Sequence, residues 1–355
     1  MSYFYILLTL LSGGIFGLLF MALKIPNGLR IGAMLGAAVL SIVFHLAYMP
    51  PQTRFLVQAI AGALIGCSME QSDLMRLPRV IKPTLIMLIS FLILNIFAGV
   101  LIHRVSPLDW ATSFMGLIPG GVTEAPIVAA DMGADVPKVA LMQLARYTLG
   151  IAVFPPMILA WDQFVEKTKN PNPDSPPAGT VVRRRQAPSK PLRAFLCTMA
   201  AAMTFGFIGS MARIPAGVFL FAIIAVLALK LKFNFAVIPP WAKRFAQLIS
   251  GCYIGSAITM NDVRGFRFLA LPLVIITGGY IINSFITGKI LSRVCGFSRK
   301  EGMLTTTPAG ASDIALSSSD IGVENTDIII IQIFRAIITM TVFPQIINVL
   351  LVFLS

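Results

Sequence analysis

Runs of about twenty apolar residues constrain this chain more than any other feature of its sequence. Residues 3–23, 82–102 and 268–288 are examples, and each is long enough to cross the ~30 Å hydrocarbon core of a bilayer as a helix. The composition agrees, since only 12% of the residues are charged, against roughly 25% in soluble domains. We therefore expect an all-α polytopic protein in the lipid bilayer of the cytoplasmic membrane, with its first apolar run as a span and not a cleaved signal peptide.

The formal net charge of +13 does not change this interpretation. The basic residues lie in loops between apolar runs, so we interpret them as topology signals, and nucleic acid is not an expected partner. The four cysteines are spaced singly and are typical of small apolar side chains in helices. No metal and no organic cofactor is expected.

The chain repeats itself at an offset of 189 residues. The matching positions are mostly Gly, Pro and polar residues, which an apolar composition does not supply by chance. They include Ile25-Pro26 with Ile214-Pro215, Gly66 with Gly255, Pro119 with Pro308, Gln143 with Gln332, and Arg146 with Arg335. Internal duplication is typical of transporter folds. We expect membrane repeats at 1–161 and 192–355, joined by a proline-rich, basic, cytoplasmic linker at 162–191.

Each repeat contains six apolar segments. The fifth determines whether the two repeats have the same or opposite orientations in the membrane. The segments lie near 3–23, 29–49, 53–69, 82–102, 110–131 and 137–161, and near 192–212, 216–231, 242–260, 268–291, 302–324 and 326–353. Helix-breaking residues in the fifth favour a re-entrant or broken-helix hairpin that returns to its starting side. With both termini outside, 20 of the 28 Lys and Arg residues then lie inside and 5 outside. The positive-inside rule thus favours two inverted repeats, each with about five transmembrane helices plus one hairpin.

The two breaks, "LIPGGVTEAP" at 117–126 and "TTPAGASDIA" at 306–315, predict the functional site. Inverted repeats bring both tips to the midplane, where half-helix ends can hold an anionic group. Intramembrane acids are costly and usually functional, so Glu124 and Asp313 could take up H⁺ or Na⁺ as the coupling ion; a structural kink is the alternative. The predicted substrate or ion site comprises Gly120, Gly121, Thr123, Glu124, Asp131, Gln143, Arg146, Gly310, Ser312, Asp313, Asp320, Gln332 and Arg335.

Gln and Arg three residues apart share one helix face in each repeat. We expect Arg146 to pair with Asp131 or Glu124, and Arg335 with Asp320 or Asp313. A structural ion pair and an anion-binding arginine are both consistent with this pattern. Asn95 and Asn283, at an offset of 188, are expected to bridge helices.

The motifs "PGGVTEAPIVAADMGADVPKVALMQLAR" and "PAGASDIALSSSDIGVENTDIIIIQIFR" resemble those of the membrane AbrB family. The resemblance covers nearly the whole chain outside the linker. The family is similar to the cation:proton antiporter and anion transporter group, which implies inverted repeats and transport through a midplane site. There is no resemblance to the soluble DNA-binding regulator that shares the name.

These features predict a secondary transporter, not an enzyme, for a small solute, with an organic anion favoured by the paired arginines. The alternatives are a membrane-embedded regulator and, because family members also carry that label, an ammonia monooxygenase subunit. Only two histidines are present, His45 and His103, in different segments, which argues against a clustered copper or iron site. A homodimer is left open.

Overall fold

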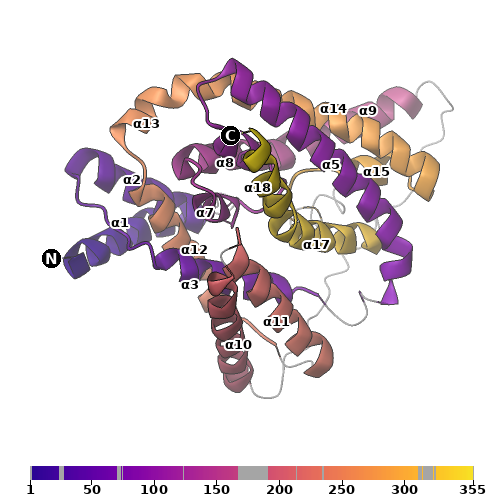
Figure 1. Cartoon of the computed structure of the whole chain (residues 1–355). Coiled ribbons are helices and arrows are strands. Elements are labelled where there is room, and N and C mark those ends of the chain that lie inside the picture. The colour runs from indigo at the N-terminus through magenta and orange to yellow at the C-terminus, as the bar shows by residue number, and fades with distance from the viewer. Residues whose placement is uncertain are drawn as a thin grey trace.

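The computed structural model is built of helices throughout the residues that it describes, which are 2–23, 28–69, 73, 75–122, 124–166, 191–212, 214–233, 236–310, 314, 323 and 325–354. Figure 1 shows their arrangement. In the first half the helices are α1 (Ser2–Ala22), α2 (Gly28–Phe44), α3 (Thr53–Gly66), α5 (Leu77–Val105), α6 (Trp110–Met115), α7 (Glu124–Asp131), α8 (Val136–Ala152) and α9 (Phe154–Glu166).

The second half repeats this order. Its helices are α10 (Pro191–Met211), α11 (Gly217–Phe233), α12 (Pro240–Ser256), α13 (Met260–Gly265), the 3₁₀ helix η1 (Phe266–Leu269), α14 (Ala270–Cys295), α15 (Arg299–Thr305), α17 (Thr326–Thr341) and α18 (Phe343–Leu354). Helices α1, α2, α6 and α9 begin 189 residues before α10, α11, α15 and α18. The period found in the sequence is therefore also the period of the helix boundaries.

Membrane-spanning length and hydropathy are present in both halves. Among the described residues, six helical stretches are long and apolar enough to cross a bilayer: Tyr3–Ala22, Leu77–Val105, Val136–Trp161, Leu192–Met211, Arg267–Cys295 and Asp327–Leu354. Helices α2 and α3 are shorter apolar helices. Many of the exposed large side chains are apolar, including Ile93, Phe97 and Ile282. The expected all-helical, multi-pass membrane protein is confirmed at this level.

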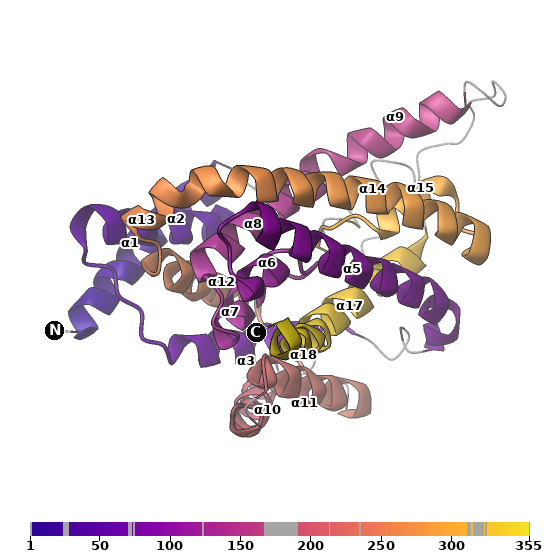
Figure 2. The ribbon, with the colours of Figure 1, turned by 45° about the horizontal axis from the view of Figure 1, so that its top comes forward.

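The helices form two groups (Figures 1 and 2). The first group contains α1 to α3 and α10 to α12. In it each half packs on the other, because α2 lies against α12 and α3 lies against α11. Small residues allow this close approach: a Cβ on Gly62 would lie 2.8 Å from the carbonyl oxygen of Phe219, and one on Gly255 would lie 2.1 Å from that of Met34. The second group contains α5 to α9, α14, α15, α17 and α18, and most of the largest buried cluster lies in it, around Phe91 and Phe114.

Helices α5 and α14 run antiparallel through the second group. The Lys82 ammonium, near the start of α5, donates to the Val294 carbonyl near the end of α14, at 3.4 Å. Halfway along, the rings of Phe91 and Tyr280 lie 5.8 Å apart. These two residues are separated by 189 positions, so equivalent residues of the two halves meet.

The fifth segment of the first half is interrupted, as the sequence predicts. Helix α6 ends at Met115, α7 begins at Glu124, and Pro119 lies in the break. The backbone N–H of Asp135, just beyond α7, donates to the Thr112 hydroxyl in α6 at 2.9 Å. The segment therefore returns to its own beginning and forms a hairpin. In the second half α15 ends at Thr305 and residues 306–310 are not helical.

The described helices end and begin close to the expected limits of the linker. Helix α9 continues to Glu166, beyond the expected start of the linker at residue 162, and α10 begins at Pro191. Residues 167–190 lie outside the described part of the chain.

Candidate functional site

Local capping residues set where the broken segments start. The Asp109 carboxylate accepts from the N–H of Thr112 at 2.9 Å and caps α6. The equivalent residue, Ser298, caps α15 and forms a capping box with Glu301. A cap satisfies N–H groups that a helix start leaves free. Helix α6 then stops close to Pro119, which has no N–H to donate.

The break after α6 exposes carbonyl oxygens, and buried side chains donate to all of them. Seven consecutive carbonyls, from residue 114 to residue 120, each accept a side-chain hydrogen bond. The donors are Asn95 on α5, Gln143 and Arg146 on α8, Tyr280 on α14 and Thr339 on α17. Four of these carbonyls, those of residues 116, 117, 119 and 120, accept no backbone hydrogen bond from a described residue, and an unsatisfied carbonyl costs several kcal/mol in a medium without water. The break is therefore fixed by side chains from both halves.

Gln143 and Arg146 act together, because they lie three residues apart on α8. The Gln143 amide nitrogen shares its two N–H groups among the carbonyls of Met115, Gly116 and Ile118, at 3.0–3.2 Å. Its amide oxygen accepts from Arg146 at 2.7 Å. An amide can present donor and acceptor at once, so this glutamine connects the carbonyls to the guanidinium.

The expected pairing of Arg146 with Asp131 or Glu124 is wrong within the described residues. Arg146 is 1% exposed and donates to the carbonyls of Gly120 and, at 3.0 Å, Pro308. Its guanidinium also lies over the Tyr280 ring, 6.0 Å from the centroid. Carbonyl oxygens with partial negative charge take the place of a carboxylate, since five fixed donors suit several acceptors.

The second half repeats the arrangement at the same offset. Arg335 donates to the carbonyls of Thr307, at 2.9 Å, and Ala309. Gln332 donates to the Thr305 carbonyl at 2.7 Å. The bond from Arg335 to Ala309 corresponds to the bond from Arg146 to Gly120, 189 residues earlier. Gly310 follows directly, outside any helix.

The two breaks also contact the helix that follows the break of the opposite half. The Thr339 hydroxyl on α17 shares its proton between the Arg335 carbonyl of its own helix, at 2.8 Å, and the Pro119 carbonyl, at 3.3 Å. The matching position on α8 is Gly150, where a Cβ would lie 3.0 Å from the Pro308 carbonyl oxygen. Together with the bond from Arg146 to Pro308, these contacts bring the two proline breaks together inside the protein.

Glu124 is the acid at the first break. It opens α7 and is partly buried. A Cβ on Gly121 would lie 1.7 Å from a Glu124 carboxylate oxygen, so the carboxylate lies directly against that glycine. The space that a Cβ on the neighbouring Gly120 would need is occupied in the same way by the Met340 side chain. Glycine at 121 is therefore what lets the acid fold back onto the break.

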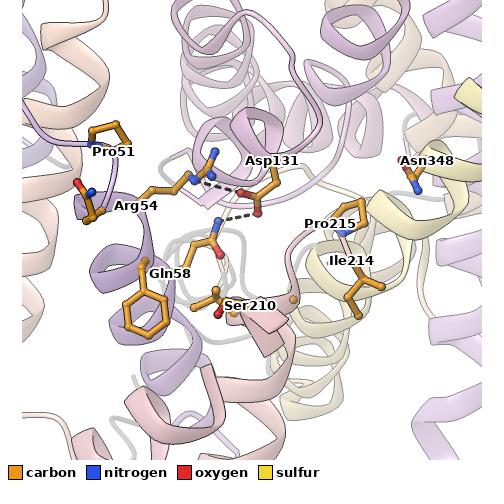
Figure 3. Close-up of a pocket in the computed structure, with 12 residues that line it drawn as sticks. Pro51, Arg54, Gln58, Asp131, Ser210, Ile214, Pro215 and Asn348 are labelled. Carbon is orange, nitrogen blue, oxygen red and sulfur yellow. Dashed lines mark hydrogen bonds and ion pairs between the residues drawn. The ribbon is translucent and has the colours of Figure 1, made fainter. Parts of the chain in front are cut away.

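Asp131 lies at the other end of α7, in a pocket that we name the Arg54 pocket (Figure 3). The Asp131 carboxylate accepts from the Gln58 amide at 2.9 Å and from the Ala216 N–H at 3.2 Å, and it pairs with Arg54 Nε at 3.1 Å. The pocket has a volume of about 540 Å³. Its lining residues are Pro51, Gln52, Arg54, Phe55, Gln58, Asp131, Ser210, Ile214, Pro215, Gly217, Val218 and Asn348.

Four predicted site residues, Thr123, Ser312, Asp313 and Asp320, lie outside the described residues. The other nine fall into two places. Gly120, Gly121, Glu124, Gln143, Arg146, Gly310, Gln332 and Arg335 gather at the breaks, whereas Asp131 lies in the Arg54 pocket. Asn283 bridges helices as expected, donating to the Ser90 hydroxyl at 3.4 Å. Asn95 does so by reaching the end of α6.

Tyr280, Thr339, Arg54 and Gln58 were not predicted as site residues. Gln58 matches Gln247 at the 189-residue offset, so the repeat could have indicated it. Tyr280 has Phe91 as its equivalent and Thr339 has Gly150, so the repeat carries no signal for either. Within the described part of the chain, no group of three or more His, Cys, Asp or Glu residues is arranged to hold a metal ion.

Comparison with known proteins identifies the family. The model of the family described as "Transition state regulatory protein AbrB" matches residues 46–351. The chain belongs to the AbrB family. Within this family it is similar to "Uncharacterized protein YhjN" of Bacillus subtilis (strain 168), with 23% identity over 90% of this chain and 87% of the relative. It is also similar to "Putative regulator AbrB" of Escherichia coli (strain K12), with 24% identity over 89% of this chain and 88% of the relative.

Proposed function

We propose that the protein is a secondary transporter that moves a small solute across the cytoplasmic membrane, coupled to H⁺ or Na⁺, and that it catalyses no chemical reaction. The observation that carries the proposal is the meeting of two interrupted segments, joined by Arg146, which donates to Gly120 of one break and Pro308 of the other. Irregular backbone at membrane depth is tolerated only when buried or lining a wet cavity. In transporters such segments form the substrate and ion site.

The packing of α5 on α14 supports an inverted arrangement of the repeats. Two parallel repeats would give these equivalent helices the same direction, and Lys82 would lie near Leu271, its equivalent in α14. Lys82 instead contacts Val294, at the opposite end of that helix. An antiparallel pair of equivalent helices is what an inversion produces.

Contacts between helix ends support the same topology. With the N-terminus outside, Arg54, Asp131 and Ala216 all fall on the outer side, and Asp131 contacts both of the others. Ser41 and Ser256 also fall there, and the Ser41 hydroxyl donates to the Ser256 carbonyl at 3.4 Å. Six crossings per repeat would instead separate Ala216 from Arg54 and Ser256 from Ser41 by the membrane thickness.

The division of roles at the breaks follows from their contacts. The guanidinium of Arg146 and the amide of Gln143 are engaged with backbone carbonyls, so they hold the shape of the break. Glu124 carries the titratable charge beside Gly121, at the N-terminal end of α7, where a helix favours negative charge. We assign binding of the coupling ion to Glu124 and to its sequence equivalent Asp313.

Transport by purified protein in liposomes tests the proposal. Imposed H⁺ and Na⁺ gradients should drive uptake or exchange of at least one member of a panel of small organic acids, amino acids and inorganic ions. Protein-free liposomes and the double variant Glu124→Gln/Asp313→Asn provide the background. A full panel without gradient-dependent flux would reject the transporter assignment.

A membrane-embedded regulator is the second candidate, because the description of the family and the name of the Escherichia coli relative both refer to regulation. A regulator would act through a partner protein or through altered transcription. Deletion of the gene should then change transcript levels, and the Glu124→Gln/Asp313→Asn variant should restore them as fully as the wild type does. If transport flux causes those changes instead, this variant should not restore the transcript levels.

A further inference from the structure

The Arg54 pocket lies between the two helix groups and is separate from the breaks. Its walls come from α3, from the end of α7, from the α10–α11 connection and from Asn348 on α18. A volume of about 540 Å³ falls in the usual range for small-molecule sites, roughly 300–1,000 Å³. Asp131 and Glu124 are the two ends of α7, so the pocket lies roughly 10 Å along that helix from the acid at the break.

Arg54 brings uncommitted donors to this pocket. It contacts Asp131 through Nε, and its two terminal nitrogens donate no hydrogen bond to any described residue. The side chain is 35% exposed, which leaves the planar end of the guanidinium accessible. That end has the geometry to bind a carboxylate or phosphate with two parallel hydrogen bonds.

Gln58 supplies the complementary acceptor. The side chain is 2% exposed, and its amide oxygen is buried without a hydrogen-bond partner among the described residues. The amide nitrogen must face the Asp131 carboxylate, which can only accept. The oxygen is therefore turned away from Asp131, as Figure 3 shows. A buried acceptor left unpaired is costly, and a ligand O–H or N–H would satisfy it.

We propose that the Arg54 pocket binds an anionic oxygen group that carries a hydroxyl or ammonium group a few atoms away. Arg54 binds the carboxylate or phosphate, and Gln58 accepts from the hydroxyl or ammonium. Two sources share this chemistry, a soluble hydroxy or amino acid and the head group of phosphatidylglycerol. The location assigned to the pocket rests on the proposed transporter function, because the topology with the N-terminus outside puts the pocket at the outer mouth of the solute path.

Equilibrium binding tests the pocket without requiring transport. Full-length protein in phosphatidylcholine nanodiscs is titrated calorimetrically with two matched pairs, L-malate against succinate and L-lactate against propionate. The hydroxylated member of each pair should bind about tenfold more tightly. Arg54→Gln should weaken its binding at least tenfold, and Gln58→Met should remove the difference within each pair.

The second repeat offers a matched control, since Lys243 is exposed and stands 189 residues after Arg54. Lys243→Gln removes the same charge and should bind malate like the wild type. Arg54→Lys keeps the charge but cannot contact Asp131 and also present two further donors in one plane. Arg54→Lys should bind malate as weakly as Arg54→Gln does. If Arg54→Gln does not fold, the malate affinity of Arg54→Lys tests the role of Arg54 in its place.

The lipid arm uses nanodiscs that also contain phosphatidylglycerol, analysed by native mass spectrometry. If the lipid is the occupant, the wild type retains phosphatidylglycerol, Arg54→Gln releases it, and added lipid displaces malate. Binding of a soluble acid or retention of the lipid supports the proposal if it depends on Arg54. Equal binding by wild type and Arg54→Gln, or no binding of either kind, overturns it. Gradient-driven flux that survives such a failure would leave the transporter assignment intact.

Discussion

At the scale of single residues, Arg146 shows how a buried cation can be accommodated without a carboxylate. The residue is 1% exposed, and its guanidinium is bonded to Gln143 and to two carbonyls. Removing a charge from water is costly unless every donor is satisfied. Here all three guanidinium nitrogens donate, to the Gln143 amide oxygen and to two carbonyls that accept no backbone hydrogen bond among the described residues, so cation and break stabilise each other.

The Tyr280 hydroxyl should contribute measurably to stability. It donates to the Leu117 carbonyl at 2.7 Å from a fully buried position. Tyr280→Phe keeps the ring and leaves that carbonyl unpaired, which should lower the unfolding free energy by about 1–2 kcal/mol. Thermal unfolding in detergent measures the change. Tyr48→Phe, whose hydroxyl donates to no described residue, is the control; equal melting temperatures for the two variants would contradict the assigned role.

The acids Glu124 and Asp313 should affect coupling unequally. They occupy equivalent positions in the sequence, but the proposed inverted arrangement would present them to one site from opposite sides. Glu124→Gln and Asp313→Asn remove charge while keeping shape, and at least one should abolish the pH or Na⁺ dependence of transport. Flux across a pH series measures this at matched protein levels, with Asp262→Asn at the surface as control. Wild-type behaviour of both variants would make the acids structural.

At the scale of elements, helices and breaks were predictable, whereas side-chain partners were not. Apolar length predicted the spans, and Pro119 with its glycines predicted the interruption between α6 and α7. The expected partners of Arg146 were wrong because a sequence displays carboxylates, while backbone carbonyls are present at every residue and carry no signal. Asp131 does not lie at the break, because the helical geometry of α7 places it about two turns from Glu124.

Chemical crosslinking between introduced cysteines tests the direction of α5 against α14. In a chain without its four native cysteines, Lys82→Cys with Val294→Cys should be joined by a short bis-maleimide, because the Lys82 side chain spans the gap to the Val294 carbonyl. Lys82→Cys with Leu271→Cys pairs equivalent positions and should not crosslink. Mobility on denaturing gels reports the bond. Preferential crosslinking of the second pair would contradict the antiparallel packing.

At the scale of the whole molecule, the halves are interlocked. Helices α2 and α3 pack on α12 and α11, and the first break takes hydrogen bonds from α14 and α17. The 189-residue period predicted equivalent elements, but not that each half would complete the other. A sequence period shows which residues are equivalent, but it does not show which residues touch, so only the structure reveals the contacts between the halves.

The orientation of the chain in the membrane can be predicted at the scale of the whole molecule. Both termini should face outside, and the linker should face the cytoplasm, because that topology puts most basic residues inside. Ser2→Cys and Ser175→Cys, each in the cysteine-free chain, are treated with an impermeant maleimide on intact cells. Ser2→Cys should label and Ser175→Cys should label only after lysis. Labelling of both from outside would refute the inverted topology.

The interlocking also sets an order for biosynthesis. Tyr280 lies 163 residues after Leu117, the carbonyl that it serves. At typical synthesis rates of about 5–20 residues per second, roughly ten to thirty seconds separate their emergence from the ribosome. During that interval the first hairpin lacks donors that only the unfinished half supplies, so it cannot yet be stable in lipid. Residues 110–135 should therefore stay at the water interface or with an insertion factor, and enter the bilayer only after α14 and α17 have been made.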